Sequence, residues 1–266
     1  MTFDELHATA SAWLAAQRQA VVVQVGPTRG SVPREAGTRM LVAAHVVVGT
    51  VGGGHLELQA IEDARTLLKS GGETFERQVA LGPSLGQCCG GVMQLRHQRL
   101  SARALADWQA PPSRFTLHLY GAGHVGRAIA ALLGGVPCRV RWLDERAAEF
   151  PPLPSPPHIH RLCSDELAAE VADAAPGDFH LVLTHSHALD LAITQAILVR
   201  GDFGYFGLIG SLTKRAKFEA RLRERGVLPE RLASMVCPIG LPGISGKEPE
   251  VIALSVVAQL LQAAAQ

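Results

Sequence analysis

This chain lacks the features of a secreted, disulfide-stabilised or membrane-spanning protein. Its 266 residues include only five cysteines, an odd number that does not indicate a disulfide framework. Its apolar runs are interrupted by Gly, His, Ser or Gln well before they reach the length that crosses a bilayer. Asp4 and Glu5 stand where a signal peptide would carry basic residues. We therefore expect a cytoplasmic protein that does not associate with membranes.

The chain also has little net charge. Lys and Arg number 25 and Asp and Glu number 24, which gives a formal net charge of +1. The basic residues gather only over residues 214–225, where they fit the solvated face of a helix. Because no global field attracts nucleic acid, we expect no nucleic-acid partner. The hydrophobic share of 47% is high enough for well-formed cores rather than disorder.

The pattern of strand-like and helix-like segments changes along the chain, which predicts two domains, at 1–107 and 108–266. In the first, Thr2 and Glu5 predict a capping box at the start of a helix. Residues 108–113, which contain two prolines, are typical of a linker. The other elements expected in this small N-terminal α+β domain are a helix at 55–69 and strands at 21–25, 38–43, 46–51, 74–80 and 91–96, with a Gly/Pro turn after the first strand.

From residue 114 onward, strand-like and helix-like segments alternate. Such alternation predicts a Rossmann-like, doubly wound parallel sheet for the C-terminal part of an α/β protein. The helix expected at 249–263 is apolar around most of its circumference, which fits either deep burial or a subunit interface. The strands are expected near 115–120, 138–143, 158–162, 179–184, 204–209 and 234–238, and the other helices near 124–134, 164–174, 188–200 and 211–225.

The most informative motif is a short apolar strand that runs into three glycines spaced G-x-G-x-x-G and then into a helix. Gly121 would allow the tight turn, Gly123 would let the backbone approach a phosphate, and Gly126 would let helix pack against strand. The amide groups at the helix start, from His124 on, would face the anion. Asp144 ends the next strand, where a ribose-binding carboxylate is expected. An ordinary glycine turn is the alternative, but the motif and its context favour a nucleotide-like ligand site.

Two further candidate segments follow expected strands, at the edge that faces the ligand crevice of an open α/β sheet. His185 and His187 follow one strand, although the hydroxyls beside them would also serve as helix caps. They do not match the H-x-H-x-D-H motif of metal hydrolases, because leucine holds the aspartate position. Gly210, Ser211 and Lys214 follow the next strand and predict a second anion site at a helix start.

The N-terminal part carries its own glycine-rich loops with charged groups, a mixture more typical of binding than of bracing. Gly53, His55 and Glu57 belong to one of them and are candidate ligand contacts. The alternative for Glu57 is that it is simply an acidic residue favoured in the first turn of a helix.

Cys88 and Cys89 form the second notable motif, and Gly90 follows them. Adjacent Cα atoms lie about 3.8 Å apart, below the roughly 4.4 Å that a relaxed disulfide needs, so free thiols are favoured. Thiolates suit a soft metal or a sulfur-bearing cofactor, whereas a tight turn with one buried cysteine is the alternative. The remaining cysteines lie in or beside expected strands and are expected to pack in the core: Cys138, Cys163 and Cys237.

Taken in order along nearly the whole chain, these segments resemble the XdhC/CoxI family. The resemblance implies a chaperone, not an enzyme, that binds the molybdenum cofactor (Mo-molybdopterin), protects its sulfurated form and delivers it to the molybdenum subunit of xanthine dehydrogenase. It also implies a cysteine desulfurase as a second partner, and a homodimer. The matching segments are Gly30–Gly37, Gly52–Glu57, Gly86–Gly91, Tyr120–Gly126, Leu183–His187, Gly207–Ser211, Cys237–Gly240 and Gly246–Pro249.

The residues suit such a cargo. Its phosphate would lie at 121–126 or at 210–214, and its metal and dithiolene end near Cys88 or Cys89. The main rival is an NAD(P)-dependent oxidoreductase that uses the Rossmann-like domain, and a metal hydrolase is a third possibility. We expect no catalytic residue, because no pair has a clear hydride-and-proton role, and the adjacent thiols lie outside the Rossmann-like part.

Overall fold

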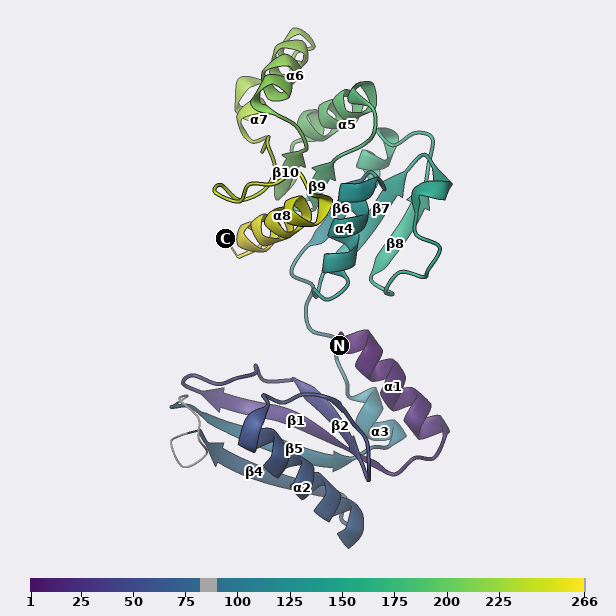
Figure 1. The fold of residues 1–266 in the computed structure, drawn as a ribbon, viewed down its shortest axis with the longest axis vertical. Helices are drawn as coiled ribbons and strands as arrows, with labels where there is room; N and C mark the ends of the chain where they lie inside the picture. Colours follow the sequence, from purple (N-terminus) through teal and green to yellow (C-terminus); the bar gives the residue numbers. More distant parts are fainter. Residues whose placement is uncertain (82–89, 266) are drawn as a thin grey trace. The chain divides into compact units, whose positions relative to one another are not determined.

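The computed structural model describes residues 1–81 and 90–265, and it separates into two compact units, Met1–Pro111 and Pro112–Gln266 (Figure 1). Cys88 and Cys89 lie outside the described residues. No helix in the described ranges combines the length and the apolar character that crossing a bilayer requires.

The first unit is a five-stranded antiparallel sheet in the order β3-β2-β1-β5-β4. The predicted capping box at its first helix is confirmed, since the Glu5 amide donates to the Thr2 hydroxyl at 3.2 Å and the Thr2 amide donates to the Glu5 carboxylate at 2.7 Å. The elements are α1 (Phe3–Ala15), β1 (Ala20–Arg29), β2 (Arg39–Ala43), β3 (Val47–Gly49), α2 (Gly54–Ser70), β4 (Thr74–Ala80), β5 (Val92–Arg99) and α3 (Ala102–Ala106).

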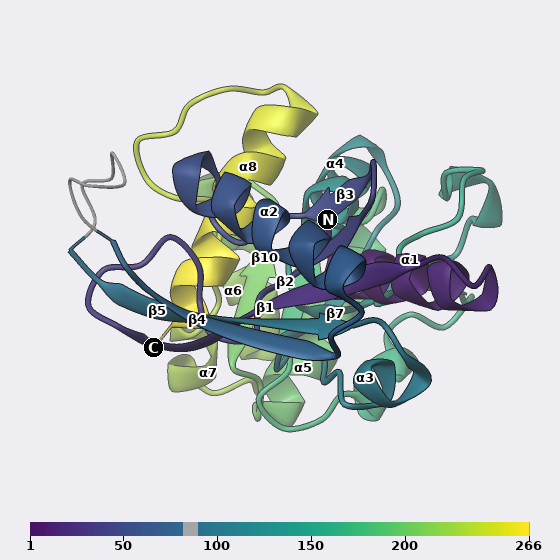
Figure 2. The same cartoon turned by 90° about the horizontal axis from the view of Figure 1, so that it is seen from below.

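Both faces of this sheet are covered, which explains why β1 is a run of valines rather than an alternating strand. Val21, Val23 and Val25 pack against α2, whereas Ala20 and Val22 pack on the side of α1. Figures 1 and 2 show α2 lying along the sheet.

Two N-terminal predictions were wrong. The chain does not turn after Val25, because β1 continues to Arg29 with a shift of register between Val25 and Thr28. An irregularity of this kind tolerates Pro27, which cannot donate to the ladder. Trp108, which the linker prediction included, instead packs its ring near those of Phe3 and His7 on α1.

The second unit is a five-stranded parallel sheet in the order β10-β9-β6-β7-β8, which confirms the Rossmann-like prediction. Because the strand order reverses between β6 and β9, the loops after these two strands flank the switch point. The elements are β6 (Thr116–Tyr120), α4 (His124–Leu133), β7 (Arg139–Asp144), η2 (Ala147–Glu149), β8 (Ile159–Cys163), η3 (Ala169–Asp173), β9 (Phe179–Val182), α5 (His187–Arg200), β10 (Tyr205–Leu208), α6 (Leu212–Glu224), α7 (Pro229–Ala233) and α8 (Pro249–Ala263).

Helices cover both faces of the parallel sheet (Figure 1). One core contains side chains of α4 and α8 with Leu119 and Trp142, and the other contains side chains of α5 and α6 with Tyr120 and Phe206. The inner face of α8 is deeply buried, although Leu254 on the same helix is 59% exposed.

Three C-terminal predictions were wrong. The helix expected at 164–174 is only the 3-10 turn η3, and the carbonyls of residues 171, 172 and 174 accept hydrogen bonds from the guanidinium of Arg200. The strand expected at 234–238 makes a single bridge at Val236, since Pro238 has no amide to extend the ladder. Cys163 is exposed rather than packed in the core, unlike Cys138 and Cys237.

Candidate functional site

A groove with a volume of about 350 Å³ lies at the carboxyl edge of the parallel sheet. Its lining comes from the segments that follow β6, β7, β9 and β10, and therefore it lies at the switch point where Rossmann-like sheets bind ligands. The lining residues are Gly123, His124, Val125, Arg146, Glu149, Leu183, Thr184, His185 and Ile209.

The three glycines of the turn after β6 have different surroundings. Gly121 has a φ of +123°, and a Cβ there would collide with the carbonyl of Leu183. A Cβ on Gly126 would collide with the carbonyl of Gly121, so α4 could not approach the strand. A Cβ on Gly123 would meet nothing within 4 Å. Gly121 and Gly126 are therefore needed by the fold itself, whereas Gly123 faces open space at the groove.

The helix that begins at this turn has no side-chain cap from any residue that the structure describes. The other long helix that starts beside the groove differs, because the Leu189 amide of α5 donates to the Ser186 hydroxyl at 3.4 Å. The first-turn amides of α4 therefore remain available to an anion that enters the groove from outside.

Asp144 holds the glycine turn through a hydrogen bond to the Ala122 amide. Its Oδ2 accepts the Ala122 amide at 2.6 Å and the Arg146 Nη2 at 3.0 Å, and its Oδ1 accepts the amide and Nε of Arg146 at 2.9 and 3.0 Å. Burial raises the pKa of Asp144, but the hydrogen bonds from Arg146 and Ala122 outweigh it and lower the pKa overall. Because four hydrogen bonds saturate a carboxylate, a ribose diol could bind Asp144 only by displacing Arg146.

The charged side chains of the groove pair with one another. Arg146 Nη1 lies 3.4 Å from Glu149 Oε1, and Arg127 Nη2 lies 3.5 Å from Glu149 Oε2. On the other side, His185 Nε2 lies 3.4 Å from Glu145 Oε1. The groove thus carries mixed charge rather than a strong positive field.

Lys214, predicted to bind an anion, instead forms a buried ion pair. Its Nζ lies 2.6 Å from Asp190 Oδ2 and donates to the Ile209 carbonyl at 2.9 Å. Asp190 is 1% exposed, and its Oδ1 accepts the amide and hydroxyl of Thr184 at 3.0 and 2.7 Å. The pair holds two groove-lining residues, Thr184 and Ile209, in place. Sequence reasoning did not identify Asp190, because an acidic residue in the first turn of a helix is an ordinary feature.

The other predicted contacts in this part lie near the groove but do not line it. His187 is the exposed first residue of α5. Gly210 precedes Ser211, which caps α6 by accepting the Lys214 amide at 3.2 Å. The helix-capping alternative therefore describes Ser211 as well as Ser186.

In the first unit, a carboxylate from α2 binds the glycine-rich turn that precedes this helix. The Oε2 of Glu57 accepts the amides of Val51 and Gly53, each at 3.2 Å, and also the Thr50 hydroxyl. Gly53 has a φ of +76°, and His55 is exposed. Glu57 therefore holds the turn that precedes α2, a structural role close to the alternative weighed from the sequence, although α2 has no side-chain cap from the described residues.

The other N-terminal motifs lie side by side. Gly30 packs on Gly91, since a Cβ on Gly30 would lie 3.1 Å from the Gly91 Cα. A Cβ on Gly91 would collide with the Ser31 carbonyl, and a Cβ on Gly52 would lie 2.7 Å from Pro33. Gly90 has open space around it. These close approaches bring the segments around residues 30, 52 and 91 together.

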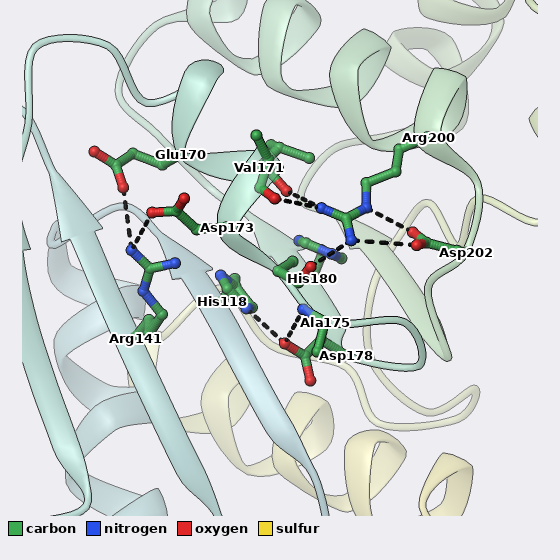
Figure 3. Close-up of polar contacts among 12 residues, drawn as sticks. His118, Arg141, Glu170, Val171, Asp173, Ala175, Asp178, His180, Arg200 and Asp202 are labelled. Atoms are coloured by element: carbon green, nitrogen blue, oxygen red, sulfur yellow. Dashed lines mark hydrogen bonds and ion pairs between the residues drawn. The ribbon is translucent and has the colours of Figure 1, made fainter.

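A buried polar row crosses the parallel sheet on the α5 side (Figure 3). His118 Nε2 donates to Asp178 at 2.9 Å, the His118 and His180 rings stack with centroids 5.0 Å apart, and the Tyr120 hydroxyl lies 3.5 Å from His180 Nδ1. Burial lowers the pKa of His118, and it lowers the pKa of His180 to about 3. Both rings are therefore neutral at physiological pH. The sequence analysis did not identify this row, because single histidines in apolar strands carry no motif.

Arginines close the row at its ends. Arg141 pairs with Glu170 at 3.1 Å and Asp173 at 3.3 Å, and Arg200 pairs with Asp202 at 2.8 Å (Figure 3). None of these side chains lines the groove, so the row stabilises the sheet rather than contacting a ligand there. Within residues 1–81 and 90–265, no three His, Cys, Asp or Glu side chains come together as a metal site would require.

Comparison with known proteins gives matches over both units. Residues 117–260 match the XdhC Rossmann domain, and residues 13–78 match the XdhC and CoxI family. The uncharacterized protein YqeB of Escherichia coli K12 is 32% identical over 252 residues, which cover 91% of this chain but only 43% of YqeB. The chain thus spans less than half the length of that curated relative.

A solved structure described as a xanthine dehydrogenase from Bacillus halodurans has a similar fold. The TM-score is 0.76 at 20% sequence identity, and the alignment covers 99% of this chain and 96% of the other. At that identity the similarity concerns the fold alone.

Proposed function

We propose that this chain, which belongs to the XdhC and CoxI family, is a chaperone of the molybdenum cofactor rather than a turnover enzyme. It would bind Mo-molybdopterin, protect it in its sulfurated form and deliver it to the molybdenum subunit of xanthine dehydrogenase. A cysteine desulfurase is the proposed partner for sulfuration. We further propose that the protein works in the cytoplasm as a homodimer.

The observation that carries the proposal is the groove at the carboxyl edge of the parallel sheet. There α4 begins without a side-chain cap from the described residues, and Gly123 leaves room for a ligand to reach the backbone. Such a helix start binds phosphate, and molybdopterin carries one. We therefore propose that the phosphate binds at the amides from Gly123 to Gly126.

The occupied carboxylate of Asp144 favours this cargo over a nicotinamide dinucleotide. In dinucleotide-binding folds the carboxylate at the end of the second strand binds the ribose hydroxyls. Here that position is filled by Arg146 and the Ala122 amide, with Asp144 only 2% exposed. A ligand that lacks the adenosine ribose, as molybdopterin does, has no need of this contact.

For the reactive end of the cargo, we propose that Cys88 and Cys89 act as protecting thiols. Both lie outside the described residues, and the proposal stands on the affinity of thiolates for soft metals. Gly91, a described residue of the same motif, lies where a Cβ would collide with the carbonyl of Ser31.

The test is to purify the protein without oxygen from cells that make the cofactor, and to identify the bound small molecule by native mass spectrometry. We expect one molybdopterin per chain in the wild type and a several-fold lower occupancy in Gly123→Ala. The double variant of Cys88→Ser and Cys89→Ser should lose molybdenum, whereas Cys163→Ser, which removes an exposed thiol within the described residues, should not. Stoichiometric NAD(P) in place of a pterin would contradict the proposal and support the oxidoreductase.

A further inference from the structure

One acidic side chain of the groove lies where it would oppose a small anion. Glu149, on the 3-10 turn after β7, lines the groove beside Arg146. Its carboxylate lies between two guanidinium groups, 3.4 Å from Arg146 and 3.5 Å from Arg127 in the first turns of α4. The three side chains are between 32% and 36% exposed, so solvent and solutes reach them.

The contacts of Glu149 are loose in comparison with those of its neighbour. Arg146 holds Asp144 through two parallel bonds of 3.0 Å, the geometry of a strong bidentate pair. The distances of 3.4 and 3.5 Å to Glu149 lie outside the usual range for a charge-assisted hydrogen bond. Glu149 is therefore attracted by charge without being locked in place, and its negative charge remains at the groove.

We propose that Glu149 is a specificity-determining residue that keeps small inorganic anions out of the groove. A phosphate group at the start of α4 would come within reach of Arg127 and Arg146, and it would have to displace or face the Glu149 carboxylate. Inorganic phosphate or pyrophosphate brings nothing to compensate for that repulsion. The inference rests on the proposed function only in taking this groove as the place where the phosphate of a ligand binds.

A pterin-bearing ligand differs because it also donates hydrogen bonds. The amino group and the adjacent ring N–H of a pterin form two parallel donors, similar to the edge of a guanidinium. A carboxylate released from an arginine can accept such a pair. Glu149 would thus disfavour a bare anion and tolerate, or bind, an anion attached to a pterin.

The test is isothermal titration of the full chain with inorganic pyrophosphate, comparing the wild type with Glu149→Gln. We expect Glu149→Gln to bind pyrophosphate about tenfold more tightly than the wild type. The matched control is Glu145→Gln, which removes the same charge from a carboxylate that is 33% exposed and pairs with His185 instead. Its dissociation constant should stay within twofold of the wild-type value.

An unchanged or weaker affinity in Glu149→Gln, no measurable binding to that variant, or an equal gain in Glu145→Gln would overturn the inference. The affinity of Glu149→Ala for pyrophosphate should change in the same direction. The melting temperatures of both variants are compared with that of the wild type to exclude misfolding. Because the probe is inorganic, a negative result in this titration does not contradict the proposal that the protein retains molybdopterin. Conversely, a protein that never holds molybdopterin can still show the pyrophosphate pattern.

Discussion

The two units each contain a glycine-rich turn that leads into a helix, and the carboxylate that binds the turn comes from a different element in each unit. Before α2, the Glu57 carboxylate reaches back over its own helix start and accepts the amides of Val51 and Gly53. Before α4, the supporting carboxylate of Asp144 comes from the neighbouring strand and binds the turn at the Ala122 amide. Neither helix has a side-chain cap from the described residues, but the carboxylate beside the start of α2 belongs to that helix, whereas the one beside α4 belongs to β7 and is paired with Arg146.

This difference shows that glycines followed by a helix do not by themselves make an anion site. What matters is where the nearest carboxylate comes from. A residue in the first turn of the helix itself competes with any ligand, whereas one on the adjacent strand can fix the turn without covering the helix amides. The predictions below test that distinction in order of decreasing effect.

The largest expected effect separates two glycines of the same turn. Gly126→Ala should destabilise the second unit by about 3 kcal/mol, because its Cβ would collide with the Gly121 carbonyl. Gly123→Ala should change the unfolding free energy by no more than about 0.5 kcal/mol, since its Cβ meets nothing. Denaturant unfolding measures both. Equal losses would mean that the two glycines do not have the separate roles assigned here.

Lowering the pH should destabilise the second unit more than the first. The folded pKa of His180 is about 3, below the usual value of about 6.5, so its contribution is fully present above pH 6.5 and is lost as the pH falls toward 3. At pH 5 this histidine alone should cost the second unit about 2 kcal/mol. Burial also lowers the pKa of His118 there, and that of His97 in the first unit, so the second unit should lose more.

Hydrogen exchange followed by mass spectrometry reports the two units separately at pH 7 and pH 5. In His180→Phe the pH dependence of the second unit should be shallower, whereas replacing the exposed His185 with Gln should leave it unchanged. A second unit as acid-resistant as the first would contradict the buried, neutral state of the histidine row.

Removing the Glu57 carboxylate, which binds the turn before α2, should have a smaller effect on stability. Glu57→Ala should cost the first unit about 1.5 kcal/mol, because two amides and a hydroxyl lose their acceptor. The exposed Glu62 of the same helix provides the control, and its replacement by Ala should cost less than about 0.5 kcal/mol. Similar values for the two variants in thermal unfolding would remove the basis of the comparison.

The smallest expected effect concerns α5, the capped helix beside the groove. Ser186→Ala should cost about 1 kcal/mol by removing the acceptor of the Leu189 amide, and Ser186→Gly should cost only a few tenths. Urea unfolding gives both values. If Ala and Gly are equally tolerated, the hydroxyl does not serve as a cap.

Local conformational requirements could be predicted from the sequence, and partners distant along the chain could not. The positive φ of Gly121 and the tight approach at Gly126 follow from a motif of six residues. The pairing of Asp190 with Lys214 joins residues 24 apart, so only the packing of α5 against α6 reveals it. Asp144 was expected to bind a ligand, because its bond to the Ala122 amide, 22 residues away, exists only once β7 lies beside the turn.

Two further arrangements depend on residues distant along the chain. The carbonyls of residues 171, 172 and 174 accept hydrogen bonds from the side chain of Arg200, which belongs to a later helix. The row of His118 and His180 is likewise created by the parallel register of β6 and β9. Neither arrangement has a signal within one segment.

The most direct test of the central claim is hydrogen exchange at the two glycine turns when anaerobic Mo-molybdopterin is added to the full chain. We predict slower exchange of the amides in residues 121–127 and no change in residues 52–57, where the Glu57 carboxylate accepts the Gly53 amide and would repel an anion. Unchanged exchange at 121–127 with the cofactor bound, or protection at 52–57 instead, would contradict the account.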